Sequence, residues 1–278
     1  MLESIRGLPD KTINELIEEN LLEQIRYYGT APGTALIENN NIIKLLTDIP
    51  LPFFNCVLYY NLDSASLKRE INRFIEYGQS KKISLLWVKG PSSVPRDIEP
   101  ILTGKGFKYD DHMIGMAIDI QDLNNDPGDI PGFKIEKVGD ERQLADWVHT
   151  CLKGFDENGK NYESIYEFEK TLGLGTGLPW VRFTGTAHGE PVATCAVFMG
   201  SRVAGLDNVT TISGWRKKGI GTSMVSHALK FAYSRGYRVG VLQASDMGFT
   251  LYRCLGFRKF AESKEFIWKS NSIRMAKR

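Results

Sequence analysis

The stretch of residues 209–232 constrains the fold of this chain more than any other part of the sequence. A β-branched run at residues 209–212 is interrupted by Ser213-Gly214, and a basic, glycine-containing segment follows. Beyond it, apolar residues recur at helical spacing: Ile220, Met224, Ala228 and Ala232. Gly236 then supplies a stop. We therefore predict a strand, a glycine-rich turn and a helix that buries one face.

The turn has the features of an anion-binding site. Gly219 and Gly221 let the backbone come close to a ligand, and the N–H groups and dipole at a helix start attract anionic oxygens. Three basic side chains stand at its mouth: Arg216, Lys217 and Lys218. We expect the ligand to be a phosphate or pyrophosphate.

Two well-known phosphate loops do not fit this turn. A Walker loop needs a lysine directly after Gly219, where Ile220 stands, and a dinucleotide fingerprint needs a third glycine, where Met224 stands. The remaining pattern, Arg216-x-x-Gly219-x-Gly221, resembles the acetyl-CoA pyrophosphate loop of the GNAT acetyltransferases. A predicted strand at residues 237–245 and a short helix follow, and the helix ends in Leu-Tyr-x-x-x-Gly-Phe at residues 251–257, which is similar to the family's second signature.

This resemblance implies a cofactor site. It implies that acetyl-CoA is the co-substrate and that its pantetheine arm pairs with the backbone of Val209, Thr210 and Thr211. The resemblance places the pyrophosphate on Lys217, Lys218, Gly219, Ile220, Gly221 and Thr222, with Arg216 at the rim. Ser245 stands near the position where many relatives carry an asparagine that contacts the arm. That departure leaves open whether a hydroxyl makes this contact.

Tyr252 is the candidate acid, because it holds the tyrosine position of the second signature. A phenol with an ordinary pKa near 10 is protonated at neutral pH and can protonate a departing thiolate. The ordinary pKa of the corresponding thiol is about 8.5. Packing of the ring on the cofactor arm is the structural alternative. The general base is left open between Asp207, Glu190 and a water-mediated route.

Composition excludes several functional classes. The 278 residues carry a net charge of +2, which gives no general case for nucleic acid or an anionic membrane as partner. No apolar run approaches a membrane span and the N-terminus lacks the core of a signal peptide, so we expect a cytoplasmic protein. The four cysteines and four histidines are scattered, and we expect mostly buried, reduced thiols and no metal. The oligomeric state is left open.

The second half of the chain has the element order expected of the GNAT fold. Strands are predicted at residues 133–138, 180–187, 191–198 and 204–212, and helices at 141–151 and 162–172. The resemblance covers residues 133–269 and implies that acceptor residues come from the region of residues 151–178. Residue types there suit many amines.

The first half repeats the outline of the second. An amphipathic helix capped by Asp10 is predicted to end near Gly29, and it precedes strands at residues 34–38 and 42–48. From Cys56 the order is strand, helix, strand, short helix with Gly106-Phe107, strand, as it is after residue 192. Leu102 stands where Tyr252 stands in the second half, and an acidic residue replaces the glycine loop.

We therefore predict a mixed α/β protein with a tandem of two GNAT-like domains. Residues 1–123 form a degenerate domain without a cofactor site, residues 124–132 a linker, and residues 133–278 the acetyltransferase domain. An unrelated α/β domain is the alternative for the first part.

Two functions from different classes fit these observations. The first is an acetyl-CoA-dependent N-acetyltransferase acting on an amine of a small molecule or protein. The second is a CoA-binding sensor or partner-regulating module without turnover. A Rossmann-type nucleotide enzyme is a more distant third. Tyr252 and the glycine loop are both present, which favours the enzyme. A site that had lost its activity would be expected to have lost these residues, as the first half has.

Overall fold

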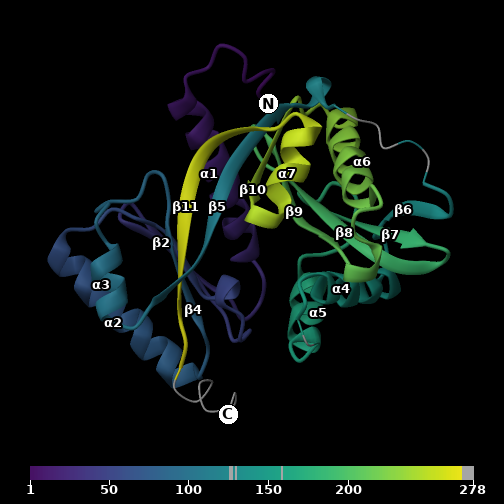
Figure 1. The fold of residues 1–278 in the computed structure, drawn as a ribbon. Helices are drawn as coiled ribbons and strands as arrows, with labels where there is room; N and C mark the ends of the chain where they lie inside the picture. Colours follow the sequence, from purple (N-terminus) through teal and green to yellow (C-terminus); the bar gives the residue numbers. More distant parts are fainter. Residues whose placement is uncertain (125–127, 129, 158, 271–278) are drawn as a thin grey trace. The chain divides into compact units, whose positions relative to one another are not determined.

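The computed structural model describes residues 1–124, 128, 130–157 and 159–270. The chain divides into two compact units (Figure 1). Unit 1 consists of Met1–Gln24 and Ile114–Phe260, and unit 2 consists of Ile25–Met113 and the segment that begins at Ala261. Three elements have residues in both units: α1 (Asp10–Tyr28), β5 (Lys108–Asp119) and β11 (Arg258–Trp268).

Unit 1 is built on a mixed sheet in the order β5-β10-β9-β8-β7-β6. Its own strands are β6 (Phe133–Lys137), β7 (Trp180–Ala187), β8 (Glu190–Met199), β9 (Ala204–Thr211) and β10 (Val239–Ala244). Its helices are α4 (Glu141–Gly154), α5 (Tyr162–Thr171), α6 (Ile220–Ser234) and α7 (Asp246–Leu255). Among the described strands of this sheet, only β9 and β10 pair in parallel, because α6 crosses over between them.

The unit 1 strands carry a core on each face. Phe183 of β7 packs its ring at 5.0 Å from His227 of α6, while its neighbour Arg182 lies 6.0 Å from the Trp147 ring of α4. Successive residues of a strand point to opposite faces, so α6 and α4 cover opposite sides of the sheet (Figure 1). The α6 side holds an apolar cluster, which includes Met224 and Leu229.

The first residues of the chain belong to unit 1. Ile13, Leu16 and Ile17 of α1 are buried with Val203, Val239 and other residues of the sheet. The Ile5 backbone N–H donates to Asp119 Oδ1 at 2.8 Å and thereby fixes the segment before α1. The N-terminal helix therefore completes the fold of the second half of the chain.

Unit 2 repeats the strand and helix order of unit 1 in shorter form. Its elements are β1 (Ala35–Asn39), β2 (Ile42–Leu46), β3 (Cys56–Tyr60), α2 (Ser64–Lys81), β4 (Leu85–Lys89) and α3 (Glu99–Gly104), with sheet order β1-β2-β3-β4-β11. The parallel pair β3–β4 flanks α2, as β9–β10 flanks α6. Both short helices end alike: Phe107 N–H donates to Leu102 O and Phe257 N–H donates to Tyr252 O, each at 3.0 Å.

Each half of the chain provides a strand to the other unit. Residues 114–119 of β5 pair antiparallel with β10, whereas residues 264–268 of β11 pair antiparallel with β4. This division differs from domains that are contiguous in sequence, so the boundaries at residues 123 and 133 stay a proposal. Of the predicted linker, residues 125–127 and 129 lie outside the described part, as do residues 271–278 of the predicted second domain.

The helices and most of the strands lie where the sequence pattern predicts them. β11 is the exception, since no strand was predicted after Phe257, although Ala261, Ser263 and Phe266 are buried on it. The prediction of mostly buried thiols is confirmed for Cys56, Cys151 and Cys195, while Cys254 is exposed. No helix of the described residues is both long and apolar enough to cross a membrane.

Candidate active site

The site begins where β9 and β10 separate. Their parallel pairing covers only residues 204–206 of β9 and 240–242 of β10, although β9 continues to Thr211 and β10 to Ala244. Beyond Leu206, no strand among the described residues pairs with the β10-facing edge of β9. The predicted pantetheine residues Val209, Thr210 and Thr211 lie on this open stretch. An extended ligand arm could hydrogen-bond there as an added strand.

A β-bulge at Asn208 accounts for the separation. Asn208 has a left-handed backbone with φ 49°, and the β8–β9 register shifts between Thr194 and Ala196. The bulge is fixed from two elements, because Thr194 Oγ1 donates to Asn208 O at 2.8 Å and Cys151 Sγ contacts Asn208 Oδ1 at 3.7 Å. An extra residue bends and twists a strand, so β9 turns away from β10 here.

The predicted pyrophosphate loop ends at the start of α6. Lys217 and Gly219 have positive φ values of 61° and 79°, and Gly219 is the N-cap. The first bond inside the helix is Ser223 N–H to Gly219 O at 3.0 Å. The N–H groups of Ile220, Gly221 and Thr222 therefore precede the helical ladder, and no side chain in the described part of the chain caps them. This is the donor arrangement that binds phosphate oxygens at other helix starts.

The basic residues of the loop have different surroundings. Arg216 Nε donates to Thr211 O at 2.9 Å, and an Nη of the same side chain donates to Gly154 O at 3.0 Å. Lys218 Nζ lies 4.4 Å from the centre of the Trp215 ring, whereas Lys217 is exposed. Arg216 therefore ties the loop to β9 and α4, and its contact with a phosphate stays a prediction.

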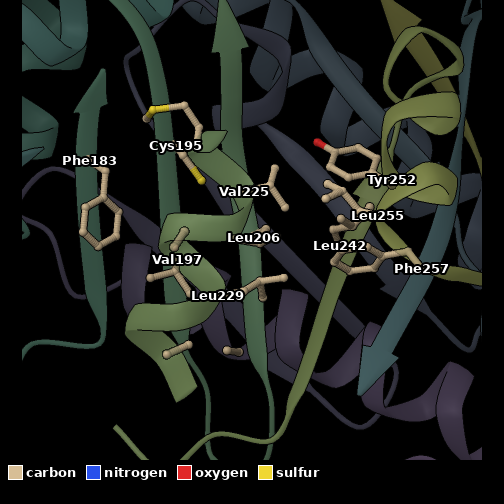
Figure 2. Packing of buried hydrophobic residues seen from close by; sticks show 14 of the residues in the cluster. Phe183, Cys195, Val197, Leu206, Val225, Leu229, Leu242, Tyr252, Leu255 and Phe257 are labelled. Carbon is tan, nitrogen blue, oxygen red and sulfur yellow. The ribbon is translucent and has the colours of Figure 1, made fainter. Parts of the chain in front are cut away.

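Tyr252 lies on α7 at the border of the unit 1 core. Its ring packs at 5.8 Å from Phe257, and its hydroxyl points away from Phe257 toward the side where Cys195 lies (Figure 2). Within the described part of the chain, this hydroxyl makes no hydrogen bond to protein. Burial raises the pKa of Tyr252 above its ordinary value, and nearby Cys195 and Asp207 add to the shift. The phenol therefore stays protonated over the physiological range and is free to donate.

Ser245 and the two candidate bases occupy different environments. Ser245 Oγ accepts from Gly248 N–H at 3.4 Å and caps α7, so a contact with the cofactor arm stays a prediction. Glu190 is exposed at the start of β8. Asp207 is the first residue of β9 after its last pair with β10, and burial raises the pKa of its carboxyl, with a smaller rise from Glu169.

A buried ion pair positions the predicted acceptor region. Arg182 Nε of β7 donates to Glu169 Oε2 of α5 at 2.7 Å, and Trp180 Nε1 donates to the same oxygen at 3.0 Å. The guanidinium also donates to Gly173 O at 2.9 Å. Both charged side chains are at most 3% exposed. Removing one partner of such a pair leaves an uncompensated buried charge, so α5 and the glycine-rich segment after it are firmly placed.

In unit 2 the corresponding strand edge is occupied by the chain itself. The β3–β4 pairing covers only residues 56–57 and 86–87, so these strands also separate. Val94 N–H donates to Tyr60 O at 2.8 Å, and Val94 O accepts from Leu62 N–H at 3.0 Å. These two bonds place the segment after β4 along the open edge of β3. At the start of α2, the Asp63 carboxylate accepts the N–H groups of Ala65 and Ser66, each at 2.9 Å. A carboxylate thus occupies the position that corresponds to the predicted phosphate site.

Residues 142–257 match the model of the acetyltransferase (GNAT) family. This segment is a GNAT domain. No curated protein matches the chain. Among solved structures, a GCN5-related N-acetyltransferase from Kribbella flavida superposes with a TM-score of 0.69 at 14% identity, covering 97% of this chain and 99% of that one.

Two further structures extend the likeness. A functionally unknown conserved protein from Staphylococcus epidermidis has a TM-score of 0.65 at 13% identity, covering 86% of this chain and 95% of that one. A tandem GNAT protein from the clavulanic acid biosynthesis pathway has a TM-score of 0.58 at 11% identity, covering 94% and 96%. Such identities show the fold alone. The fold is a mixed sheet flanked by helices, arranged as a tandem of two GNAT-like halves.

Sequence reasoning missed two features of the site. Gln24 of α1 donates to Asp207, although 183 residues separate them, and no local pattern marks this pair. The second feature is the segment around Val94, for which the sequence indicates no contact with the open edge of β3. Proline-rich composition indicates a loop and does not indicate which strand edge it meets.

Proposed function

We propose that the chain is an N-acetyltransferase that transfers the acetyl group of acetyl-CoA to an amine by direct attack on the thioester. The family and fold are those of acyl-CoA-dependent acetyltransferases in general. The observation that carries the proposal is the conjunction of three features in unit 1: the open edge of β9, the uncapped start of α6 and the free hydroxyl of Tyr252.

The donor groups fit the parts of acetyl-CoA. The open edge of β9 at Val209, Thr210 and Thr211 suits the amides of the pantetheine arm. The segment of residues 217–222 offers N–H groups and positive charge to the pyrophosphate. Unit 2 supports this assignment, because there a peptide segment and a carboxylate take the same two positions.

The proposed reaction uses two side chains for proton transfer. A carbon–nitrogen bond forms between the acceptor amine and the acetyl carbon, and the carbon–sulfur bond to CoA breaks. Asp207 takes the proton that the attacking nitrogen loses, and Tyr252 gives its proton to the leaving sulfur. Later exchange with water restores both groups, so the net products are the N-acetyl amine and CoA thiol.

Asp207 is favoured over Glu190 as the base. Its carboxyl lies at the point where β9 leaves β10, and its charge raises the pKa of Tyr252, which supports a shared role. A raised pKa brings a carboxylate closer to the value that suits a general base near neutral pH. Exposed Glu190 has no such environment.

The test is calorimetric titration of acetyl-CoA followed by an assay of CoA release with pooled primary amines. We expect wild type to bind and turn over, and Tyr252→Phe to bind with unchanged affinity but to lose about 10²–10⁴-fold in kcat. CoA is measured chromatographically, so that the exposed thiol of Cys254 does not contribute to the signal. Tyr233→Phe is the matched control, since Tyr233 is an exposed tyrosine on α6.

Other outcomes separate the competing functions. Binding by both proteins without turnover of any amine would favour a CoA-binding sensor or regulatory module. Absence of binding, with tight binding of a nicotinamide or adenine nucleotide instead, would contradict the assignment of the loop at residues 216–222. Equal kcat in wild type and Tyr252→Phe would remove the acid role and leave packing as the function of the ring.

A further inference from the structure

The carboxylate of Asp207 is held by two N–H donors from different parts of the chain. Its Oδ1 accepts the backbone N–H of Asn208 at 2.6 Å, and its Oδ2 accepts Nε2 of Gln24 at 2.5 Å. An ionised carboxylate is an acceptor only, and each oxygen has two lone pairs. The pair of donors therefore orients the group and leaves lone pairs for a further partner.

Gln24 is fixed in place by the helix that carries it. Asn20 Nδ2, one turn earlier on α1, donates to Val203 O at 3.0 Å, and Glu23 Oε2 accepts Ser201 N–H at 2.8 Å. A Cβ added at Gly205 would lie 1.9 Å from Asn20 Oδ1. The helix can therefore pack this closely on β9 only because residue 205 is a glycine. Gln24 itself is 4% exposed. The Gln24 amide is therefore buried and held in a defined position within unit 1.

Several other groups act electrostatically at Asp207, each from a different element. Glu169 of α5 raises the pKa of Asp207, and Asp207 in turn raises the pKa values of Tyr252 of α7, Cys195 of β8 and Cys151 of α4. Burial opposes ionisation of Asp207, while the hydrogen bonds from Gln24 and Asn208 favour it. Among the described residues, Gln24 is the side chain whose hydrogen bond lowers the pKa of Asp207 and so counteracts the effect of burial.

We propose that Gln24 is a positioning residue for the transfer reaction: its amide holds Asp207 ionised and oriented to accept the proton of the acceptor amine. This inference rests on the proposed function. It means that the N-terminal helix, which precedes the degenerate half, completes the active site of the second half. Asp207 is the catalytic group, and Gln24 acts through it.

The experiment compares wild type, Gln24→Leu and Gln24→Glu in the full-length chain. Loss of the donor, or its replacement by a carboxylate, disfavours ionised Asp207, so the acid limb of the kcat/KM pH profile moves to higher pH. At pH 6 we expect kcat/KM to fall about tenfold in Gln24→Leu, with a smaller loss at pH 8.5 and unchanged acetyl-CoA affinity. Glu15→Gln is the matched control, because Glu15 is exposed on the same helix and pairs with exposed Lys11, and its profile should overlay that of wild type.

A second readout does not depend on turnover. ¹³C-aspartate NMR follows titration of the Asp207 carboxyl directly, with the resonance assigned by its loss in Asp207→Asn. We expect the midpoint to move to higher pH in Gln24→Leu and to stay in place in Glu15→Gln. Movement in an inactive protein would support the Gln24 contact while the acetyltransferase assignment failed. An unmoved midpoint, or a uniform loss of kcat/KM at all pH values, would overturn the inference.

Discussion

Glu265 shows how a single buried carboxyl can make the stability of unit 2 depend on pH. It lies on β11 opposite Val88 of β4. Burial, with smaller contributions from Asp110 and Asp111, raises its pKa from the ordinary 4.5 to about 7. Between these values the folded state holds a proton that the unfolded state has lost. Stability therefore falls as pH rises through this window and stays reduced above it.

We predict that Glu265→Gln stabilises the protein at pH 8 and has little effect at pH 4.5. The amide removes the ionisation penalty, which we expect to be about 3 kcal/mol. Urea unfolding at both pH values checks this, with Glu262→Gln, an exposed position on the same strand, as the control. Equal gains at both pH values would show that the substitution acts through packing and not through charge.

At the scale of elements, the starts of α2 and α6 distinguish the two halves. Asp63 caps α2 with its own carboxylate, while Gly219 leaves the first N–H groups of α6 without a side-chain cap. The open edge of β3 is likewise taken by the segment at Val94, while that of β9 is open. The halves share an arrangement of strands and helices. Among the described residues, only the second half has both an open strand edge, on β9, and a helix start without a side-chain cap, on α6.

We predict that one acetyl-CoA binds per chain, at α6. Gly219→Asp places a negative charge where the pyrophosphate is proposed to lie, and calorimetry should show at least about a hundredfold loss of affinity. Asp63→Asn keeps a side-chain cap on α2 and should leave affinity and stoichiometry unchanged. Two sites per chain in wild type, or weaker binding in Asp63→Asn alone, would contradict this assignment.

At the scale of the whole molecule, the two halves depend on each other for structure. Unit 1 takes residues 114–119 of β5 as the neighbour of β10, together with the first part of α1 over Val203 and Val239. Unit 2 takes the end of β11 as the neighbour of β4. A polypeptide cut at the predicted linker would therefore separate strands from the sheets that they complete.

We predict that a fragment of residues 133–278 does not fold by itself. It lacks the strand that pairs with β10, and it exposes the apolar residues that α1 covers, so we expect aggregation or a loss of cooperative unfolding. Size-exclusion chromatography and thermal unfolding of this fragment test the point. Co-expression with residues 1–132 should restore a folded complex. A monomeric fragment with cooperative unfolding would instead favour the domain boundaries predicted from the sequence.

Local patterns in the sequence determined much of this protein. The apolar spacing from Ile220 onward predicted α6, the glycines at 219 and 221 predicted the turn before it, and the second signature marked Tyr252. These features depend on neighbours within a few turns of chain, where periodicity and backbone preference act. The element order of the first half was likewise apparent, because each of its helices and strands has its own pattern.

Only the tertiary structure decided how distant parts of the chain meet. The contact between Gln24 and Asp207, the separation of β9 from β10 and the exchange of β5 and β11 all join residues far apart in sequence. The edge of a strand can pair with many other strands, and a buried side-chain amide can hydrogen-bond to many polar groups. The packing of the whole chain determines which of these partners each one meets. The residue types at the candidate site could therefore be predicted from the sequence, whereas the geometry that brings them together could not.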